Sequence, residues 1–510
     1  MNDFLRKNWL IMALAMVKFL MHYLLYNSSY DLQRDEYLYL DQANHMAWGF
    51  MEVPPALSLQ AYLTLLMGNG LFWIKFWPVV CGALTVLVTG RIVLELGGGL
   101  FAQALACLSV IVSAYMRLNM LFQPNSLEVL LWTTSFLLLV RYIHTQKPAC
   151  LLWLGVLFGL GLLNKYSAVF FIVGTLVGLL LTPYRTLLWN KTLYLAALIT
   201  FVLFLPNLLW QLTHNIPFLY HMALLSKHQL QHVQTSDFLK DQLLMCFPVL
   251  FVWTVGLVAI FVVKSLRKYL LVGIIYLTVM GILIIFHGKN YYTLGLYPVL
   301  LAFGSLVWER STKQGWQYWL RPALLIIPLA LLIPLFPLLY PIWSPEKTEV
   351  FARNFKELGL LRWEDGKDHP LPQDYADMLG WQELAEKVAA TYQKLPEPER
   401  KQTIIVCANY GQAGAINYYG QKYHLPQAYS TEASYLLWIP DEPPFKNIII
   451  VDDEPDPIEA HFKYYKEESR IENPYAREKD TQIVLALDAD NAIKKAFYLE
   501  IKEKKRPFGL

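Results

Sequence analysis

The chain carries many apolar segments long enough to cross a membrane, and this feature restricts its fold more than any other. A membrane-spanning helix needs roughly 20 apolar residues, and on that rule we count about eleven spans. They lie at residues 9–26, 72–96, 99–116, 124–143, 149–164, 166–183, 192–212, 243–263, 269–287, 291–308 and 319–341. We therefore expect a polytopic α-helical membrane protein with about eleven transmembrane helices plus interfacial helices, consistent with a hydrophobic fraction of 55%.

Composition and charge change near Trp343 and divide the chain into two domains. Residues 343–510 carry 22 Lys and Arg against 29 Asp and Glu, a net charge of −7, whereas residues 1–342 have a net charge of +10. The later part alternates short β-rich runs with amphipathic helices, and residues 403–407, 447–451 and 482–487 are predicted as buried strands. We expect a transmembrane domain at 1–342 and a soluble α/β domain at 343–510.

The distribution of basic residues predicts the orientation of the chain. Short cytoplasmic loops collect Lys and Arg. With the N-terminus in the cytoplasm, thirteen of the 21 basic residues between residues 1 and 342 fall on the cytoplasmic side. An odd number of spans then places the C-terminal domain on the outer face of the membrane.

Acidic residues are concentrated in the loop between the first two predicted spans. Residues 1–342 contain eleven Asp and Glu, and five of them are Asp31, Asp35, Glu36, Asp41 and Glu52. Ionised carboxylates are costly near hydrocarbon, so we expect them where water, substrate or a cation meets them. We interpret this stretch as a catalytic loop, with Asp35 as general base for an acceptor hydroxyl and Glu36 as a positioning or metal-binding carboxylate. Capping of an interfacial helix is the alternative.

An amphipathic helix is predicted directly after these acids. Leu40, Ala43, Ala47 and Phe50 recur at spacings of three and four residues, which is typical of a helix lying on a bilayer. We expect Pro54-Pro55 to end this helix.

Basic side chains at the same outer face are candidates for binding an anion. Arg117, Lys165 and Lys289 lie at this face, from which positive charge is otherwise largely excluded. Each could simply extend towards the interface. Together they resemble a clamp for an anionic headgroup such as a departing phosphate. Further candidates for the site are Arg34, Glu52, Glu128, Asn164, His287, Tyr291 and Tyr292.

Signals for a metal or a nucleotide are weak. His228 and His232 could share a helix face, and with Glu52 they are weak candidates for binding a divalent metal, which we leave open. No other cofactor is indicated. Gly411 to Gly414 follows a predicted strand but lacks the full spacing of a phosphate-binding loop, so a structural tight turn is favoured.

A series of short motifs runs in order along nearly the whole chain. The motifs are Arg34-Asp35-Glu36, Trp48-Gly49, Pro54-Pro55, Gln123-Pro124-Asn125, Gly161 to Tyr166, Pro206 to Gln211, Gly288 to Tyr292, Tyr297-Pro298 and Asn409 to Ile416. The series resembles the bacterial family 39 glycosyltransferases, which are related to protein O-mannosyltransferases and to the lipid A aminoarabinose transferase. The resemblance implies the GT-C fold.

Roles for particular residues follow from this resemblance. It implies that Asp35 is the catalytic base and that Lys165, Lys289 and Arg117 bind the donor phosphate, together with Tyr291 and Tyr292. The family's Glu-Lys-Pro-Pro run matches Glu52-Val53-Pro54-Pro55 here, and Val53 cannot bind phosphate. Where relatives carry Asp in the second outer loop, this chain has Glu128.

The function implied is an inverting glycosyltransferase of the inner membrane. It would move a sugar from a polyprenyl-phosphate donor to a periplasmic acceptor, which could be a lipid, a glycan or a protein. Expected partners are the donor lipid, the acceptor and membrane lipids, with no nucleic acid. The alternative is a polytopic transporter or lipid-carrier flippase without chemistry, whose signature would be charges at the membrane midplane and paired broken helices. We expect the C-terminal domain to control access of the acceptor and to contribute no catalytic group.

Overall fold

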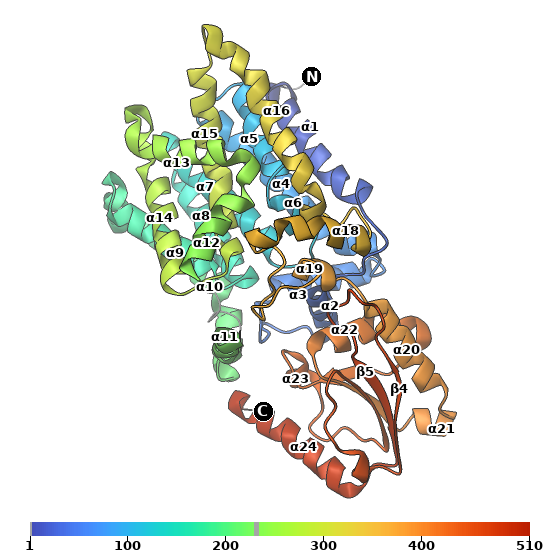
Figure 1. Cartoon of the computed structure of the whole chain (residues 1–510). Helices are drawn as coiled ribbons and strands as arrows, with labels where there is room; N and C mark the ends of the chain where they lie inside the picture. The colour runs from blue at the N-terminus through green and yellow to red at the C-terminus, as the bar shows by residue number, and fades with distance from the viewer. Residues whose placement is uncertain (1–2, 229–233, 510) are drawn as a thin grey trace. The chain divides into compact units, whose positions relative to one another are not determined.

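The computed structural model describes residues 3–228 and 234–509, which form two compact units (Figure 1). One, here called the helical unit, comprises Met1–Tyr26, Gly70–Leu208 and Ser226–Tyr340. The other, here called the sheet unit, comprises Asn27–Asn69, Leu209–Leu225 and Pro341–Leu510. Residues 27–69, here called the first loop, therefore fold with the C-terminal residues of the chain.

The helical unit is built from apolar helices. Its helices are α1 (Asp3–Leu24), α4 (Leu71–Glu95), α5 (Leu100–Ile111), α6 (Tyr115–Leu118), α7 (Asn125–Thr145), α8 (Pro148–Asn164), α9 (Ala168–Leu180), most of α10 (Lys191–Thr213), α12 (Thr235–Met245), α13 (Leu250–Val262), α14 (Leu270–Ile285), α15 (Tyr297–Ser311), α16 (Leu320–Leu332) and α17 (Phe336–Leu339). Shorter 3-10 turns join them at η2 (Pro183–Trp189), η4 (Phe247–Val249), η5 (Lys264–Tyr269), η6 (Asn290–Leu296), η7 (Trp316–Trp319) and η8 (Ile333–Leu335).

The spans expected from hydropathy all fall on apolar helices of this unit. Within the described residues, six helices are long and apolar enough to cross a membrane, and two bent pairs raise this number to eight. The other three expected spans fall on the shorter apolar helices α1, α5 and α8. The expected break at Asn164-Lys165 is confirmed, because α8 ends at Asn164 and α9 begins at Ala168. The chain is therefore a multi-pass membrane protein.

Two glycines allow α13 and α15 to pack with their backbones in contact. A Cβ atom on Gly256 would lie 2.1 Å from the carbonyl oxygen of Leu300, and one on Gly304 would lie 1.9 Å from that of Val252. No other residue type fits at either position without moving a helix. This contact fixes α15, which follows the η6 turn that carries Tyr291 and Tyr292.

A five-stranded mixed sheet forms the centre of the sheet unit. Its strands are β1 (Thr403–Cys407), β2 (Ala428–Ser430), β3 (Asn447–Asp452), β4 (Tyr464–Arg470) and β5 (Gln482–Leu487), in the order β2-β1-β3-β5-β4. β1 runs parallel to β2 and β3, whereas β5 is antiparallel to β3 and β4. The three strands predicted from sequence are confirmed as β1, β3 and β5.

The sheet unit also contains short and long helices. They are α2 (Arg34–Asp41), α3 (Ala56–Leu66), α11 (Pro217–His228), α18 (Pro345–Ala352), α19 (Gln373–Ala376), α20 (Trp381–Gln393), α21 (Glu397–Arg400), α22 (Tyr410–Tyr419), α23 (Tyr435–Trp438) and α24 (Asn491–Lys505). Of these, α20, α22 and α23 contact the strands, and α2 and α3 belong to the first loop. The 3-10 turns are η1 (Gln42–His45), η9 (Arg353–Leu358), η10 (Gly420–Tyr423), η11 (Glu459–His461) and η12 (Arg506–Phe508).

The amphipathic helix predicted from Leu40 to Phe50 is wrong. α2 ends at Asp41, a 3-10 turn follows, and the chain then runs without regular helix to Pro55, which caps the start of α3. The double proline therefore begins a helix, where its missing N–H costs nothing. Phe50 is fully buried and packs edge-on against Trp438, with ring centroids 6.4 Å apart. Phe50 is therefore apolar because it packs inside the protein, and not because it faces a bilayer.

Candidate functional site

The helix α22 packs closely against α2 and so positions the first acids of the loop. Asn409 caps α22, because its side chain accepts a hydrogen bond from the backbone N–H of Gln412 at 3.0 Å. A Cβ atom on Gly411 would lie 2.5 Å from the Cγ of Arg34, and one on Gly414 would lie 2.7 Å from the Cβ of Tyr37. The tight turn predicted at these glycines is wrong. They lie inside a helix and leave room for a neighbouring helix.

Asp31 and Asp41 connect the first loop to the C-terminal part of the sheet unit. An Asp31 carboxylate oxygen accepts a hydrogen bond from the backbone N–H of Trp381 at 3.0 Å. The Tyr435 hydroxyl donates to Asp41 at 2.7 Å. Both carboxylates therefore have structural partners, although the partners lie more than 340 residues away in sequence.

Glu52 is a third connection of this kind. Its two carboxylate oxygens accept hydrogen bonds from the backbone N–H of Ser434 at 2.5 Å and from the Ser434 hydroxyl at 2.7 Å. The Ser434 oxygen in turn accepts from the backbone N–H of Met51 at 3.0 Å. Burial raises the pKa of Glu52 to about 7, and the hydrogen bonds from Ser434 oppose this rise.

Glu36 completes the cap of α2. Its carboxylate accepts a hydrogen bond from the backbone N–H of Gln33 at 2.8 Å, while the Gln33 side chain accepts from the backbone N–H of Asp35 at 2.9 Å. This is a capping box. The alternative interpretation of the acidic stretch, helix capping, thus holds for one acid of the five.

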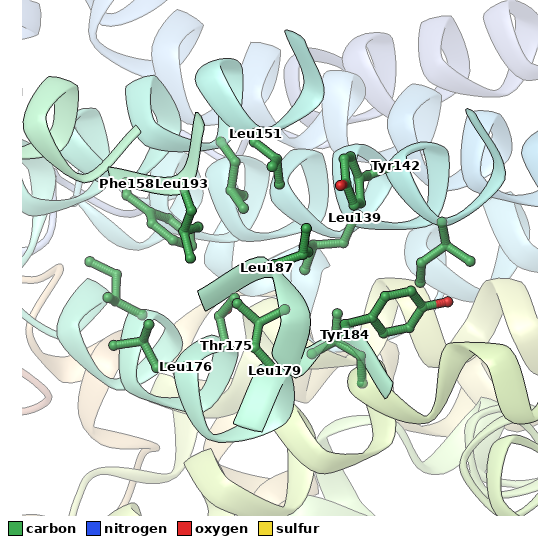
Figure 2. A pocket seen from close by; sticks show the side chains of 14 residues that line it. Leu139, Tyr142, Leu151, Phe158, Thr175, Leu176, Leu179, Tyr184, Leu187 and Leu193 are labelled. Carbon is green, nitrogen blue, oxygen red and sulfur yellow. The ribbon is translucent and has the colours of Figure 1, made fainter. Parts of the chain in front are cut away.

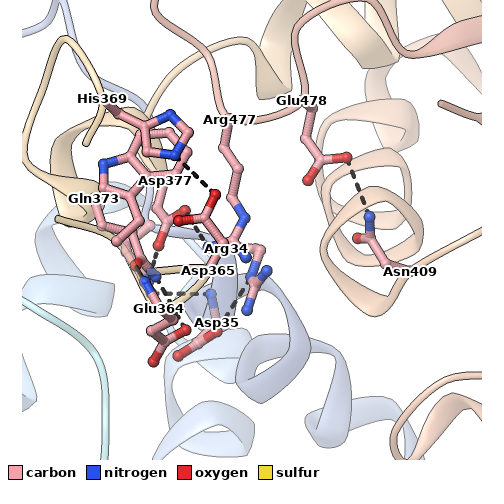
Figure 3. Close-up of polar contacts among 12 residues, drawn as sticks. Arg34, Asp35, Glu364, Asp365, His369, Gln373, Asp377, Asn409, Arg477 and Glu478 are labelled. Atoms are coloured by element: carbon pink, nitrogen blue, oxygen red, sulfur yellow. Dashed lines mark hydrogen bonds and ion pairs between the residues drawn. The ribbon is translucent and has the colours of Figure 1, made fainter. Parts of the chain in front are cut away.

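Asp35 differs from the other four acids in its surroundings. The Tyr410 hydroxyl donates a hydrogen bond to Asp35 Oδ1 at 2.7 Å. Arg34 Nε lies 3.6 Å from the same oxygen (Figure 3). The Arg34 guanidinium also lies over the Tyr410 ring, 4.8 Å from its centroid. The Asp35 side chain is 29% exposed. It is therefore held firmly and can still be reached from outside.

Further charged groups lie near the trio of Arg34, Asp35 and Tyr410, and Figure 3 labels them together with Arg34 and Asp35. Asp377 forms an ion pair with Arg477 at 3.1 Å and accepts a hydrogen bond from the Gln33 side chain at 3.3 Å. Burial raises the pKa of Asp377 to about 6, although Arg477 and Arg34 lower it. Glu478 accepts from the side chain of Asn409 at 3.1 Å and so holds the start of α22.

A second cluster of predicted residues lies in the helical unit, around Lys165. Its ammonium donates to Asn125 Oδ1 at 2.7 Å and to Glu128 Oε2 at 3.1 Å. It also lies over two aromatic rings, 4.0 Å from the centroid of Tyr292 and 5.1 Å from that of Tyr291. We call these five residues the Lys165 cluster.

Polar contacts between the turn from α8 to α9 and the start of α7 hold this cluster together. The Asn164 side chain donates to the carbonyl of Pro124 at 2.8 Å, and the Ser167 hydroxyl donates to Glu128. Burial lowers the pKa of Lys165, which lies between the two helices; Glu128 opposes this effect, and the charge of Lys289 adds to it. The charge of Lys289 is therefore felt at Lys165.

The remaining candidates do not belong to the Lys165 cluster, or they fall outside the described residues. Arg117 belongs to the short helix α6, outside the set of residues in contact with Lys165 described above. His287 is exposed and follows α14. His228 is the last residue of α11, and His232 falls outside the described residues. Among residues 3–228 and 234–509, no group of three or more His, Cys, Asp or Glu could hold a metal ion.

A small apolar cavity in the helical unit is separate from these clusters (Figure 2). Aliphatic and aromatic residues and Thr175, from α7, α8, α9, η2, α10 and α14, line it, and its volume is about 40 Å³. It has room for a few water-sized groups.

Sequence reasoning missed two residues that complete the clusters, Tyr410 and Asn125. Both lie inside quoted motifs, and each contacts a predicted site residue. An uncharged tyrosine or asparagine gives no compositional signal. Only the tertiary contact identifies them.

Comparisons with known proteins agree with the arrangement of these helices. A comparison with curated proteins finds no match. Residues 52–210 match the family model of dolichyl-phosphate-mannose-protein mannosyltransferases. The structure of apo ArnT from Cupriavidus metallidurans superposes with a TM-score of 0.62 at 14% identity, covering 94% of this chain and 97% of that one. The chain has the GT-C fold. ArnT from the same organism bound to undecaprenyl phosphate gives a TM-score of 0.59 at 13% identity, with the same coverage, and the GT-C fold thus extends over nearly the whole chain.

Proposed function

We propose that the chain is an inner-membrane glycosyltransferase that transfers a sugar from a polyprenyl-phosphate donor to a periplasmic acceptor. The observation that carries this proposal is the Lys165 cluster, a buried ammonium surrounded by polar and aromatic side chains in a chain with the GT-C fold. The mannosyltransferase family model and the undecaprenyl phosphate bound to ArnT support it. The proposal leaves open which sugar is moved, and whether the acceptor is a lipid, a glycan or a protein.

The Lys165 cluster suits a phosphate that gains charge during the reaction. Glu128 lies 3.1 Å from Lys165 and keeps a counter-charge beside the ammonium when no donor is bound. The rings of Tyr291 and Tyr292 favour the cation further. An arriving lipid phosphate brings a second anion to Lys165, with Lys289 nearby.

The proposed reaction is a single displacement. The acceptor oxygen forms a bond to the anomeric carbon while the bond from that carbon to the phosphate oxygen breaks, which inverts the anomeric configuration. Asp35 takes the hydroxyl proton as general base. The lipid phosphate leaves with the electron pair of the broken bond, and Lys165, Lys289 and Arg117 stabilise its charge. Glu36 serves this site by capping α2.

The substitution Lys165→Met tests the phosphate-binding role. The purified full-length protein, reconstituted in lipid, is given undecaprenyl phosphate carrying labelled mannose or aminoarabinose, and released lipid phosphate is measured. We expect wild-type release with one of these donors and a loss of roughly 100-fold in the variant. Lys191→Met is the matched control and should retain activity, because Lys191 is an exposed lysine at the start of α10.

Two results would contradict the proposal. If Lys165→Met released lipid phosphate at the wild-type rate, the Lys165 cluster would not be the phosphate-binding site. A wild-type protein that turns over neither donor would contradict a transferase of mannose or aminoarabinose.

A further inference from the structure

The C-terminal part of the chain supplies a hydroxyl to the candidate base. Tyr410 is the first residue of α22, and its hydroxyl donates to Asp35 Oδ1 at 2.7 Å. The two residues are 375 positions apart in sequence, and both belong to the sheet unit. The contact is therefore made by tertiary folding and is not a feature of the loop alone.

Independent contacts fix Tyr410 in this orientation. Its backbone N–H donates to Glu432 at 3.1 Å, and its ring lies under the Arg34 guanidinium. The next residue, Gly411, leaves no room for a Cβ atom against Arg34. The side chain is therefore held at its backbone, at its ring and at its hydroxyl. A side chain that orients a catalytic group is expected to be held by several contacts in this way.

The hydroxyl limits how the Asp35 carboxylate can turn. Tyr410 donates to Oδ1 at 2.7 Å and Arg34 Nε lies 3.6 Å from the same oxygen, so both groups hold Oδ1 in one place. A general base must point at the proton that it takes. The other charged groups packed around the trio are Asp377, Glu432, Arg477 and Glu478.

We propose that Tyr410 is a positioning residue that orients the base Asp35, so that the C-terminal domain completes the catalytic site. This inference rests on the proposed function. It differs from the expectation drawn from the sequence, in which that domain only controls access of the acceptor.

The chain contains a matched control for this contact. Tyr435 also donates its hydroxyl to an acid of the first loop, Asp41, at the same distance of 2.7 Å. Tyr410→Phe and Tyr435→Phe each remove one hydroxyl from one tyrosine–aspartate bond between the same two segments. If such bonds only hold the loop in place, the two variants should behave alike.

The experiment compares both variants with the wild type as full-length reconstituted protein. Turnover of the labelled undecaprenyl-phosphate donor is measured with ethanol and with trifluoroethanol as surrogate acceptors. We expect Tyr410→Phe to lower kcat about 10-fold with ethanol while the KM for the donor stays unchanged. The loss should be smaller with trifluoroethanol, because a more acidic hydroxyl needs less help from a base. Tyr435→Phe should show neither effect.

The outcomes separate this inference from the proposed function. The role of Tyr410 would be contradicted if Tyr410→Phe and the wild type had equal kcat values. It would also be contradicted if both variants lost the same activity with both alcohols. Neither result would contradict the proposed transferase function. Failure of the wild type to turn over any donor would overturn the proposed function and the inference together. If Tyr410→Phe lowers kcat and also destabilises the chain, the dependence on acceptor acidity still decides between orientation and folding.

Discussion

Glu52 illustrates how burial changes the behaviour of one carboxyl group. Its pKa rises from 4.5 to about 7, because removal from water disfavours the charged form. The folded chain therefore binds this proton more tightly than the unfolded chain. This tighter proton binding stabilises the folded chain. Its contribution to the free energy of unfolding is fully present below pH 4.5 and is lost as the pH rises through 7.

The substitution Glu52→Gln should remove this dependence on pH. Relative to the wild type, the variant should gain about 3 kcal/mol of stability between pH 5 and pH 8, because glutamine resembles the protonated acid. Thermal unfolding of the full chain in detergent at both pH values measures the difference. Asp377 also has a raised pKa, but both proteins share this residue, so its effect cancels in the comparison. If the difference in unfolding stability between variant and wild type were the same at both pH values, the raised pKa of Glu52 would be contradicted.

At this scale, the sequence identifies reactive residues but not their partners. Asp35 and Lys165 could be singled out because a charge in an apolar chain is unusual. Ser434, Tyr435 and Tyr410 could not, since polar residues of a soluble domain are common and their partners lie more than 370 positions away.

At the scale of elements, the packing of α2 against α22 depends on glycine more than on hydrophobic patterning. Glycine usually weakens a helix by about 1 kcal/mol relative to alanine. Here Gly411 and Gly414 permit a close approach of two helices that any side chain would prevent. This close approach is one of the places where the first loop and the C-terminal part meet.

Gly414→Ala should therefore destabilise the protein, contrary to the usual effect of this substitution in a helix. The new Cβ would lie 2.7 Å from the Cβ of Tyr37 and 3.0 Å from its backbone carbonyl carbon, so α2 must move. We expect a loss of about 1–3 kcal/mol, measured by thermal unfolding. Gly281→Ala is the control, since nothing lies within 4 Å of its Cβ position, and it should be neutral or stabilising. Equal effects at both glycines would contradict the packing argument.

Elements with a strong local pattern could be predicted, and those defined by their neighbours could not. The apolar spans and the strands β1, β3 and β5 follow from runs of hydrophobic residues. β4 is polar and lies at the edge of the sheet, and β2 has only three residues, so neither gives a clear signal. The helix expected from Leu40 to Phe50 failed because the same apolar spacing also arises when a turn buries its residues against another segment.

In the whole molecule, the first loop and the C-terminal residues form one unit although they lie at opposite ends of the sequence. The acids Asp31, Asp41 and Glu52 connect them, and Asp35 lies among the same contacts. A boundary drawn at Trp343 from composition alone separates residues that fold together. The loop should therefore not keep its structure without its C-terminal partners.

Deletion of residues 345–510 tests this dependence. We expect the truncated protein to lose transfer and also slow hydrolysis of the donor by water, because Asp35 and the rest of the loop lose their supports. Release of lipid phosphate by reconstituted protein measures both activities. A short insertion after Glu454, in the exposed turn that follows β3, is the control and should retain them. A stable truncated protein that still hydrolyses the donor would favour a domain that only controls access of the acceptor.

The shared unit also affects how the chain is made. Residues 27–69 are synthesised early. Leu209–Leu225 of the same unit follow, but the partners from residue 341 onward are made only after the helical unit has been translated. At typical rates of synthesis the loop waits roughly 15 to 55 s for those partners. During this time the contacts of Asp31, Asp41 and Glu52 with the C-terminal part are absent. The sheet unit can therefore be completed only after residues 341–510 have been synthesised.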